Sequence, residues 1–271
     1  MQISPRFVAP FAPFTGGMPK IASGPITNGL MGVWLPGVYQ FNLVDAAFLQ
    51  LTDTANARFG SGLFGANYNC TSANLSTAFK SLGPTYLAKS PNWTIYGLAS
   101  LGNTTSTAGA GLYCERAGSG NDIIKVDWTS PVAQLTLRND AGTIAQPSVG
   151  LSNNFGYHSF VGTKFGNGGS SNLILYLDNV TGAANWTGTD SYTDALVPTI
   201  GYDFADSSGG WPGPIVIVAV WNRVLSPVEV FQLSSDPFAM LEFPEQMLAS
   251  TLVGIFVPPP PVINLMPQAW M

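Results

Sequence analysis

The segment that most constrains the fold is an apolar run of seven residues, 215–221, which reads Ile-Val-Ile-Val-Ala-Val-Trp. The run is rich in β-branched side chains, and glycines and prolines dominate the preceding residues 209–214. A short, continuous apolar run bounded by turn-forming residues is typical of a strand that is buried on both faces. The sequence therefore predicts a β-strand here with no solvent-exposed face.

A helix start follows this run. Ser226 can accept hydrogen bonds from the free N–H groups of a first helical turn, and Pro227 suits the first helical position. Glu229, three residues after Ser226, completes a capping box. Pro237 ends the helix within about three turns. The sequence therefore predicts one short helix directly after the buried strand.

This arrangement resembles the last strand and closing helix of laminin-G-like (concanavalin A-like) jelly-roll domains. Their final segment typically reads aromatic–Asn–Arg–x–Leu–Ser–x–x–Glu–hydrophobic. Residues 235–238, Ser-Asp-Pro-Phe, resemble the continuation found in bacteriophage and bacterial versions of the domain. The residues that match the closing segment are Trp221, Asn222, Arg223, Leu225, Ser226, Glu229 and Val230.

Other segments resemble the same domain. Residues 28–35 are similar to its opening strand, and residues 157–177 to a hairpin that carries an aromatic–His pair, here Tyr157 and His158. Short strands separated by turn signals indicate a sandwich or jelly roll. We therefore predict an all-β fold: a concanavalin A-like (laminin-G-like) jelly-roll sandwich over residues 26–238 with one short C-terminal helix. Further strands are predicted at 93–99, 112–116, 123–128 and 133–138, whereas residues 45–90 show no clear pattern.

Two proline-rich arms flank the predicted domain. Prolines recur throughout residues 1–25 and exclude a helix or a central strand, and residues 239–271 contain four consecutive prolines. We expect both arms to be extended and to dock on partner proteins or on other copies of the chain in a homo-oligomer. The apolar side chains expected to make these contacts are Phe7, Phe11, Phe14, Phe256, Leu265 and Trp270.

Charge and cysteine content limit the function further. Only 9% of the residues are charged, the net charge is −5, and the ten Lys and Arg residues are scattered singly. Without a basic patch, nucleic-acid binding is not expected. No apolar run approaches the ~20 residues that cross a membrane, and the first residues do not resemble a secretory signal. Cys70 and Cys114 either form one bridge or remain buried thiols, and the second reading is favoured.

The sequence offers few groups for catalysis. The chain has four glutamates and lacks the Glu-x-Asp-x-x-Glu strand of the β-glucan-cleaving enzymes on this fold; Glu115 and Asp127 are predicted to be an exposed cross-strand pair. His158 is the single histidine, which excludes a multi-histidine metal site. The sequence contains no Gly-x-Ser-x-Gly nucleophile turn with which His158 could form a catalytic triad, so it is predicted to be a sheet residue. Residues 60–65 match G-x-G-x-x-G without a strand–helix frame and are predicted to form a loop. No enzymatic activity is expected.

Two kinds of ligand remain open. Laminin-G-like domains often hold calcium near one rim, so the resemblance implies Asp203 and Asp206 as calcium ligands, although a hydrated loop is the favoured reading. Lectin relatives bind sugars through rim aromatics, for which Trp186, Tyr192 and Trp211 are the candidates. The same side chains could instead fill a protein interface. No other cofactor is expected.

The closing motif, the few charges and the apolar arms favour a non-enzymatic structural protein of a virus particle, and the resemblance implies that the virus is a bacteriophage. It would decorate the capsid or sit on the tail, bound to other virion proteins through its arms and assembled in the host cytoplasm. The alternative is a carbohydrate-binding, lectin-like module or adhesin that attaches to glycans on the host surface.

Overall fold

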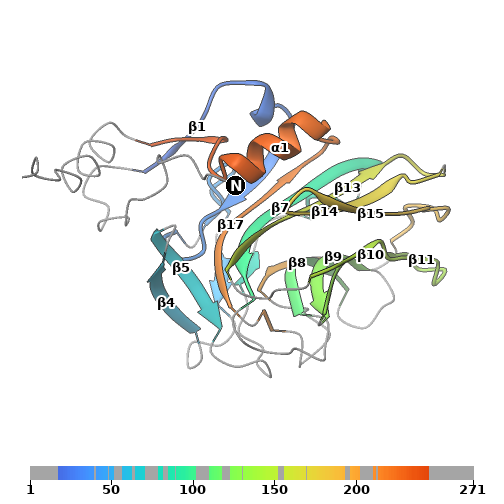
Figure 1. Cartoon of the computed structure of the whole chain (residues 1–271), viewed down its shortest axis with the longest axis horizontal. Helices are drawn as coiled ribbons and strands as arrows, with labels where there is room; N and C mark the ends of the chain where they lie inside the picture. Colours follow the sequence, from blue (N-terminus) through green and yellow to red (C-terminus); the bar gives the residue numbers. More distant parts are fainter. Residues whose placement is uncertain are drawn as a thin grey trace, which may run out of the picture.

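A computed structural model of the chain contains two large β-sheets packed face to face, with one helix on the outside of one sheet (Figure 1). The predicted all-β jelly-roll sandwich is therefore confirmed. For residues 49–51, 57–62, 65–70 and 79–81 only the backbone is described. The structure describes residues 18–39, 41–47, 49–51, 57–62, 65–70, 79–81, 85–88, 90–101, 110–117, 123–129, 131–151, 156–168, 170–192, 196–201, 210–211 and 213–243.

The first sheet, sheet I, has the strand order β15-β14-β13-β7-β17-β5-β4, and β2 also pairs with β17. Every neighbouring pair in it is antiparallel. Its strands are β2 (Leu30–Trp34), β4 (Ala57–Gly62), β5 (Gly65–Cys70), β7 (Asn92–Ser100), β13 (Tyr157–Phe165), β14 (Leu173–Leu177), β15 (Val180–Ala184) and β17 (Pro214–Trp221).

The second sheet, sheet II, has the order β11-β10-β9-β8-β16-β6-β3, and β12 also pairs with β10. It too is antiparallel throughout. Its strands are β3 (Leu49–Leu51), β6 (Phe79–Ser81), β8 (Ala110–Arg116), β9 (Ile123–Thr129), β10 (Val132–Arg138), β11 (Ile144–Ala145), β12 (Ser148–Gly150) and β16 (Val197–Ile200).

The segments predicted as strands from their residue patterns are all strands. Seven of them correspond to β2, β7, β8, β9, β10, β13 and β14. Within residues 60–65, predicted to form a loop, residues 60–62 instead end β4 and Gly65 begins β5, which pairs with β4. Strands β3 to β6 lie within residues 45–90, where the sequence showed no clear pattern.

Strand β17 lies at the centre of sheet I and is covered on both faces. Ile215, Val218 and Val220 belong to the core between the two sheets. Ile217 and Ala219 belong to a second core between sheet I and the helix α1 (Pro227–Ser235). This double burial explains why the strand has no alternating polar positions, as predicted.

Helix α1 begins as the sequence predicts. The Ser226 side chain accepts a hydrogen bond from the Glu229 N–H, and the Glu229 carboxylate accepts one from the Ser226 N–H, which completes the capping box. Val230 and Leu233 are buried against the outer face of sheet I. The helix ends at Ser235, two residues before Pro237.

A small two-stranded sheet joins the two ends of the described chain. Strand β1 (Lys20–Ile21) pairs antiparallel with β18 (Leu241–Glu242). Met240 and Leu241 are buried in the core beneath α1. Residues 1–17 and 244–271 therefore continue from neighbouring positions, and the predicted docking residues of both arms lie outside the described residues.

Gly182 of β15 lies where the edge of sheet I approaches β12 of sheet II. A Cβ atom at this position would lie 2.2 Å from the Ser148 carbonyl oxygen, which is backbone and cannot rotate away. We expect Gly182→Ala to lower the free energy of unfolding by about 1–3 kcal/mol through overpacking. Urea unfolding monitored by tryptophan fluorescence would measure the loss.

Gly150 of β12 is the matched control, because a Cβ atom there would meet no atom within 4 Å. Gly150→Ala should change the unfolding free energy by no more than about 0.5 kcal/mol. Equal stability of the two variants would mean that β12 and β15 are not packed as closely as the structure places them.

Candidate functional site

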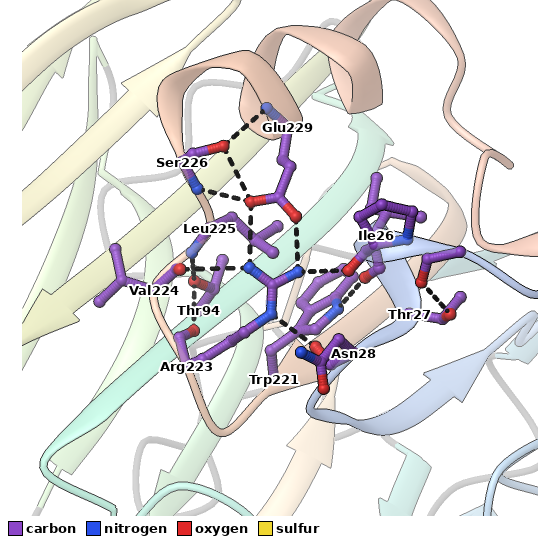
Figure 2. Close-up of polar contacts among 12 residues, drawn as sticks. Ile26, Thr27, Asn28, Thr94, Trp221, Arg223, Val224, Leu225, Ser226 and Glu229 are labelled. Atoms are coloured by element: carbon purple, nitrogen blue, oxygen red, sulfur yellow. Dashed lines mark hydrogen bonds and ion pairs between the residues drawn. The ribbon is translucent and has the colours of Figure 1, made fainter.

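The closing motif forms a polar junction around Arg223 (Figure 2). Its guanidinium group donates to both carboxylate oxygens of Glu229, with Nη2–Oε1 and Nη1–Oε2 distances of 2.6 and 3.0 Å. It also donates to the backbone carbonyls of Pro25 and Asn28, over Nη2–O and Nε–O distances of 2.8 and 2.5 Å. Arg223 therefore joins the start of helix α1 to the 3₁₀ turn η2 (Pro25–Thr27) near the beginning of the domain.

Two further side chains hold the same junction. The Trp221 indole donates to the Ile26 carbonyl over 2.7 Å. The Thr94 hydroxyl donates to the Arg223 carbonyl and accepts from the Leu225 N–H. All these donors and acceptors are used within the chain, so this motif closes the fold and is not a ligand site.

Glu229 makes the junction sensitive to acid. The hydrogen bonds from Arg223, together with those from Ser226, lower the pKa of Glu229 from 4.5 to about 2. A lowered pKa means that Glu229 stabilises the fold fully above about pH 4.5 and loses this contribution as the pH falls towards 2. We expect the stability difference between the wild type and Glu229→Gln to shrink over this range.

Urea unfolding of both proteins at about pH 6, 4 and 2.5 would test this expectation. A stability difference that stays constant from pH 6 to pH 2.5 would contradict it.

Glu115, one of the few candidates for acid–base chemistry, is fully buried in β8. Its carboxylate accepts hydrogen bonds from the backbone N–H groups of Tyr86, Leu87 and Ala88 and from the Tyr113 hydroxyl, at 2.8 to 3.2 Å. Burial raises the pKa of Glu115, and the four hydrogen bonds act in the opposite direction. The carboxylate thus anchors residues 86–88 to sheet II.

The predicted exposed pair of Glu115 and Asp127 is wrong. Glu115 pairs across the strands with Ile124, whereas Asp127 pairs with Gly111. Both carboxylates are buried, and they point to opposite faces of sheet II, because Glu115 lies beside the core residue Tyr113 and Asp127 alternates with the core residue Val126. The two groups cannot act as an acid–base pair.

Lys164 is a buried cation that the sequence did not single out. Its side chain is fully buried at the end of β13. The Nζ atom donates to the Pro91 carbonyl, to Asn167 Oδ1 and to Asp190 Oδ2 at 3.0, 2.7 and 2.8 Å. Burial lowers the pKa of Lys164, and Asp190 opposes this change. Its three acceptors account for all three of its N–H donors, so it fastens loops to sheet I.

His158 lies in β13, as predicted for a sheet residue. Its Nδ1 atom is 2.6 Å from Asp178 Oδ2, and the Asp178 carboxylate also accepts the Ser159 N–H. Asp178 and Asn179 both have positive φ angles and form the two-residue turn between β14 and β15. The Nε2 atom of His158 is buried and bonds to no group in the described part of the chain. Among the residues that the structure describes, no nucleophile is therefore aligned with this imidazole.

The aromatic residues predicted to bind sugars do not form an exposed site. Trp186 and Trp211 lie in connecting segments, but both indoles are fully buried in the core between the sheets. The Trp211 indole donates to the Ser100 carbonyl and packs edge-on against Phe160. Tyr192 is half-buried against the same core. The prediction that Trp186 and Trp211 stack on a glycan is therefore wrong.

The predicted calcium ligands Asp203 and Asp206 lie outside the described residues, so calcium binding there stays a prediction. Within the described ranges, no group of three or more His, Cys, Asp or Glu side chains could hold a metal ion. The described helices include none that is long and apolar enough to cross a membrane. Cys114 is buried in β8, whereas only the backbone of Cys70 is described, so their pairing also stays open.

The outer face of sheet II, which points away from sheet I, carries a group of polar and charged side chains. Leu135 and Leu137 of β10 and Val126 of β9 belong to the core, so the residues that alternate with them point outwards. We call this surface the polar face; it comprises Arg116, Lys125, Asp127, Gln134, Thr136, Arg138 and Gln146.

Contacts within the polar face form a connected chain. Lys125 Nζ lies 3.0 Å from Asp127 Oδ2. The Thr136 hydroxyl donates to Asp127 Oδ1 over 3.4 Å, and the Gln146 amide donates to the Thr136 hydroxyl over 3.2 Å. These contacts hold the side chains in fixed positions, so that ligand binding would cost less side-chain conformational entropy.

The polar face is more accessible towards β11 than at its centre. Asp127 and Thr136 are buried, although both point away from the core. Arg138 is half-buried, Gln146 is exposed, and Ile144 beside Arg138 is 50% exposed. A ligand would therefore approach from the β10–β11 side. The sequence contained a signal for this surface, the alternation in residues 133–138, but not the strand register that gathers the side chains.

Comparison with known proteins supports the fold. No family model and no curated protein matches the chain. Among solved structures, it is similar to the binding domain of Paraclostridial Mosquitocidal Protein 1, with a TM-score of 0.59 and 11% identity. It is also similar to domain 4 of AbnA, an extracellular arabinanase from Geobacillus stearothermophilus, in complex with arabinotriose, with a TM-score of 0.58 and 11% identity. A Trypanosoma rangeli sialidase matches with a TM-score of 0.56 and 15% identity.

These matches differ in how much of each protein they cover. The chain covers 98% of the arabinanase domain, 54% of the toxin domain and 36% of the sialidase, while 76%, 79% and 86% of the chain itself is matched. The chain thus spans about half the length of the toxin domain. At such low identity the matches establish a shared jelly-roll fold.

Proposed function

We propose that this chain is a non-catalytic carbohydrate-binding module with a jelly-roll fold. The observation that carries the proposal is the polar face of sheet II, on which amide, hydroxyl and charged groups lie on three adjacent strands. Sugars present many hydroxyl groups, and such groups are bound by convergent, preorganised donors and acceptors. The similar arabinanase domain, solved with arabinotriose, supports this function by fold analogy.

The surroundings of the residues suited to acid–base chemistry favour a binding role over a catalytic one. Glu115 is saturated with hydrogen bonds inside the core, and His158 faces no nucleophile in the described part of the chain. Cleavage of a glycosidic bond by the usual route needs two carboxyl groups on either side of the bond. Within the described polar face, Asp127 is the one carboxylate, and it is buried against Lys125.

A glycan array followed by calorimetry of the strongest ligand would test the proposal. We expect binding that weakens in Gln134→Ala and Gln146→Ala, which remove amides from the polar face. Gln232→Ala is the matched control, because Gln232 is exposed on α1, on the outside of the other sheet. Absence of any glycan ligand, or equal weakening by the control, would overturn the proposal.

A second candidate is the virus-particle role predicted from the sequence, in which the chain is a capsid decoration or a tail-associated protein. The pairing of β1 with β18 favours it, because residues 1–17 and 244–271 then continue from one place on the domain and could anchor it together. Deletion of both segments should abolish association with particles while the domain stays folded. Retention of the shortened chain on particles would rule out anchoring through the arms.

A further inference from the structure

Two arginines flank one apolar residue on the polar face. Ile123 of β9 pairs with Arg116 of β8 on one side and with Arg138 of β10 on the other. Arg138 in turn pairs with Ile144 of β11. Because directly paired residues in a sheet share one face, these side chains form a row across the outside of sheet II.

The spacing of this row suits a single ligand. Arg116 and Arg138 are separated by one intervening strand, so their Cα atoms lie about 10 Å apart, twice the usual distance between strands. Long arginine side chains from both positions can reach one group placed between them. Ile123 between them is apolar and buried, whereas Ile144 beside Arg138 is 50% exposed.

Charge is concentrated on this face. The chain has ten Lys and Arg residues in total, and three of them, Arg116, Lys125 and Arg138, lie on adjacent strands of the polar face. Asp127 is the one acidic residue among the described residues of the face, and it forms an ion pair with Lys125. The described residues of the polar face therefore carry a net positive charge in a chain whose overall net charge is −5.

One donor atom of Arg138 has no acceptor among the described residues. Its Nε atom is buried, and no group in the described part of the chain accepts a hydrogen bond from it. A buried donor without a partner is unfavourable, and a guanidinium group matches a planar carboxylate or a sulfate through two parallel hydrogen bonds. Arg138 is thus preorganised for an anionic group that arrives from outside the chain.

We infer that the polar face binds acidic glycans, with the carboxylate or sulfate of the sugar held between Arg138 and Arg116 on the β10–β11 side of the face. This inference rests on the proposed carbohydrate-binding function and adds the class of sugar and the residues that recognise it. Ile144, exposed beside Arg138, contacts the nonpolar face of the sugar ring. The amides of Gln134 and Gln146 lie on the same face, where they can bond its hydroxyl groups.

The test compares an oligouronate with the same oligosaccharide after chemical reduction of its carboxylates to alcohols. Calorimetry of the wild type should give roughly tenfold or greater preference for the oligouronate, because hydrogen bonds to charged groups are the stronger ones. The affinity for the oligouronate should fall as sodium chloride is added, whereas that for the neutral form should not. This comparison needs no variant and so does not depend on the folding of one.

The Arg138→Gln variant tests whether Arg138 binds the anionic group of the sugar. It should weaken binding of the oligouronate roughly tenfold or more and leave binding of the reduced oligosaccharide unchanged. Lys20→Gln is the matched control, since it removes one exposed cation on β1, outside sheet II. Equal affinity for both oligosaccharides, or no effect of Arg138→Gln, would overturn the inference and leave the proposed function standing. Binding of neither these nor any other glycan would overturn both.

Discussion

Glu115→Ala is expected to lower the free energy of unfolding by about 3–5 kcal/mol, because it breaks a buried hydrogen-bond network at several donors and leaves a cavity. The substitution removes the acceptor for three backbone N–H groups, those of Tyr86, Leu87 and Ala88, and for the Tyr113 hydroxyl. All four donors would stay buried without a partner, and a cavity would remain in place of the carboxylate. Urea unfolding by circular dichroism would measure the loss.

Two further variants sharpen this result. Glu242→Ala, the same change at an exposed glutamate, should alter the unfolding free energy by no more than about 0.5 kcal/mol. Glu115→Gln keeps one acceptor oxygen but turns amide hydrogens towards N–H donors, so it should still lose about 1–3 kcal/mol. If Glu115→Ala is as stable as Glu242→Ala, residues 86–88 are not held by this carboxylate.

Lys164→Met is expected to lower the free energy of unfolding by a similar amount, about 3–5 kcal/mol. The substitution leaves Asp190 without its cation in a largely buried site. Methionine keeps the apolar stem of the side chain, so the loss reports the ammonium group and its three acceptors. The measurement is again the unfolding free energy from urea titration.

A double-mutant cycle separates the ion pair from the rest of this network. Asp190→Asn in the Lys164→Met background should cost less than Asp190→Asn alone, because the uncompensated carboxylate is then removed. Strictly additive effects of the two substitutions would show that Lys164 and Asp190 do not interact.

The sequence predicted the parts of the fold that local pattern determines. The apolar run of β17 and the capping box of α1 each depend on residues within a few positions of one another, and both are present as predicted. The Arg223 contact with η2 joins residues almost 200 positions apart, and only the resemblance to known jelly rolls suggested that this arginine matters.

The candidate site was less predictable, because it depends on strand register and on side-chain direction. Trp186 and Trp211 lie in segments without periodicity, and nothing local shows that their indoles turn into the core. Arg116 and Arg138 are 22 residues apart in the sequence, and only the pairing of β8, β9 and β10 places them on either side of Ile123. The alternation within a strand predicted a solvent-facing side, but it did not predict which charged residues of neighbouring strands lie together on that side.

Binding of glycans on the polar face of sheet II can be mapped residue by residue. Titration of the ¹⁵N-labelled protein with an oligouronate, followed by two-dimensional NMR, provides this map. We expect the amide signals of β9, β10 and β11 to shift, together with the side-chain signals of Arg138 and Gln146, while those of α1 and β14 stay unchanged. Shifts confined to α1, to β14 and β15, or to the segment around Tyr192 would contradict binding on the polar face.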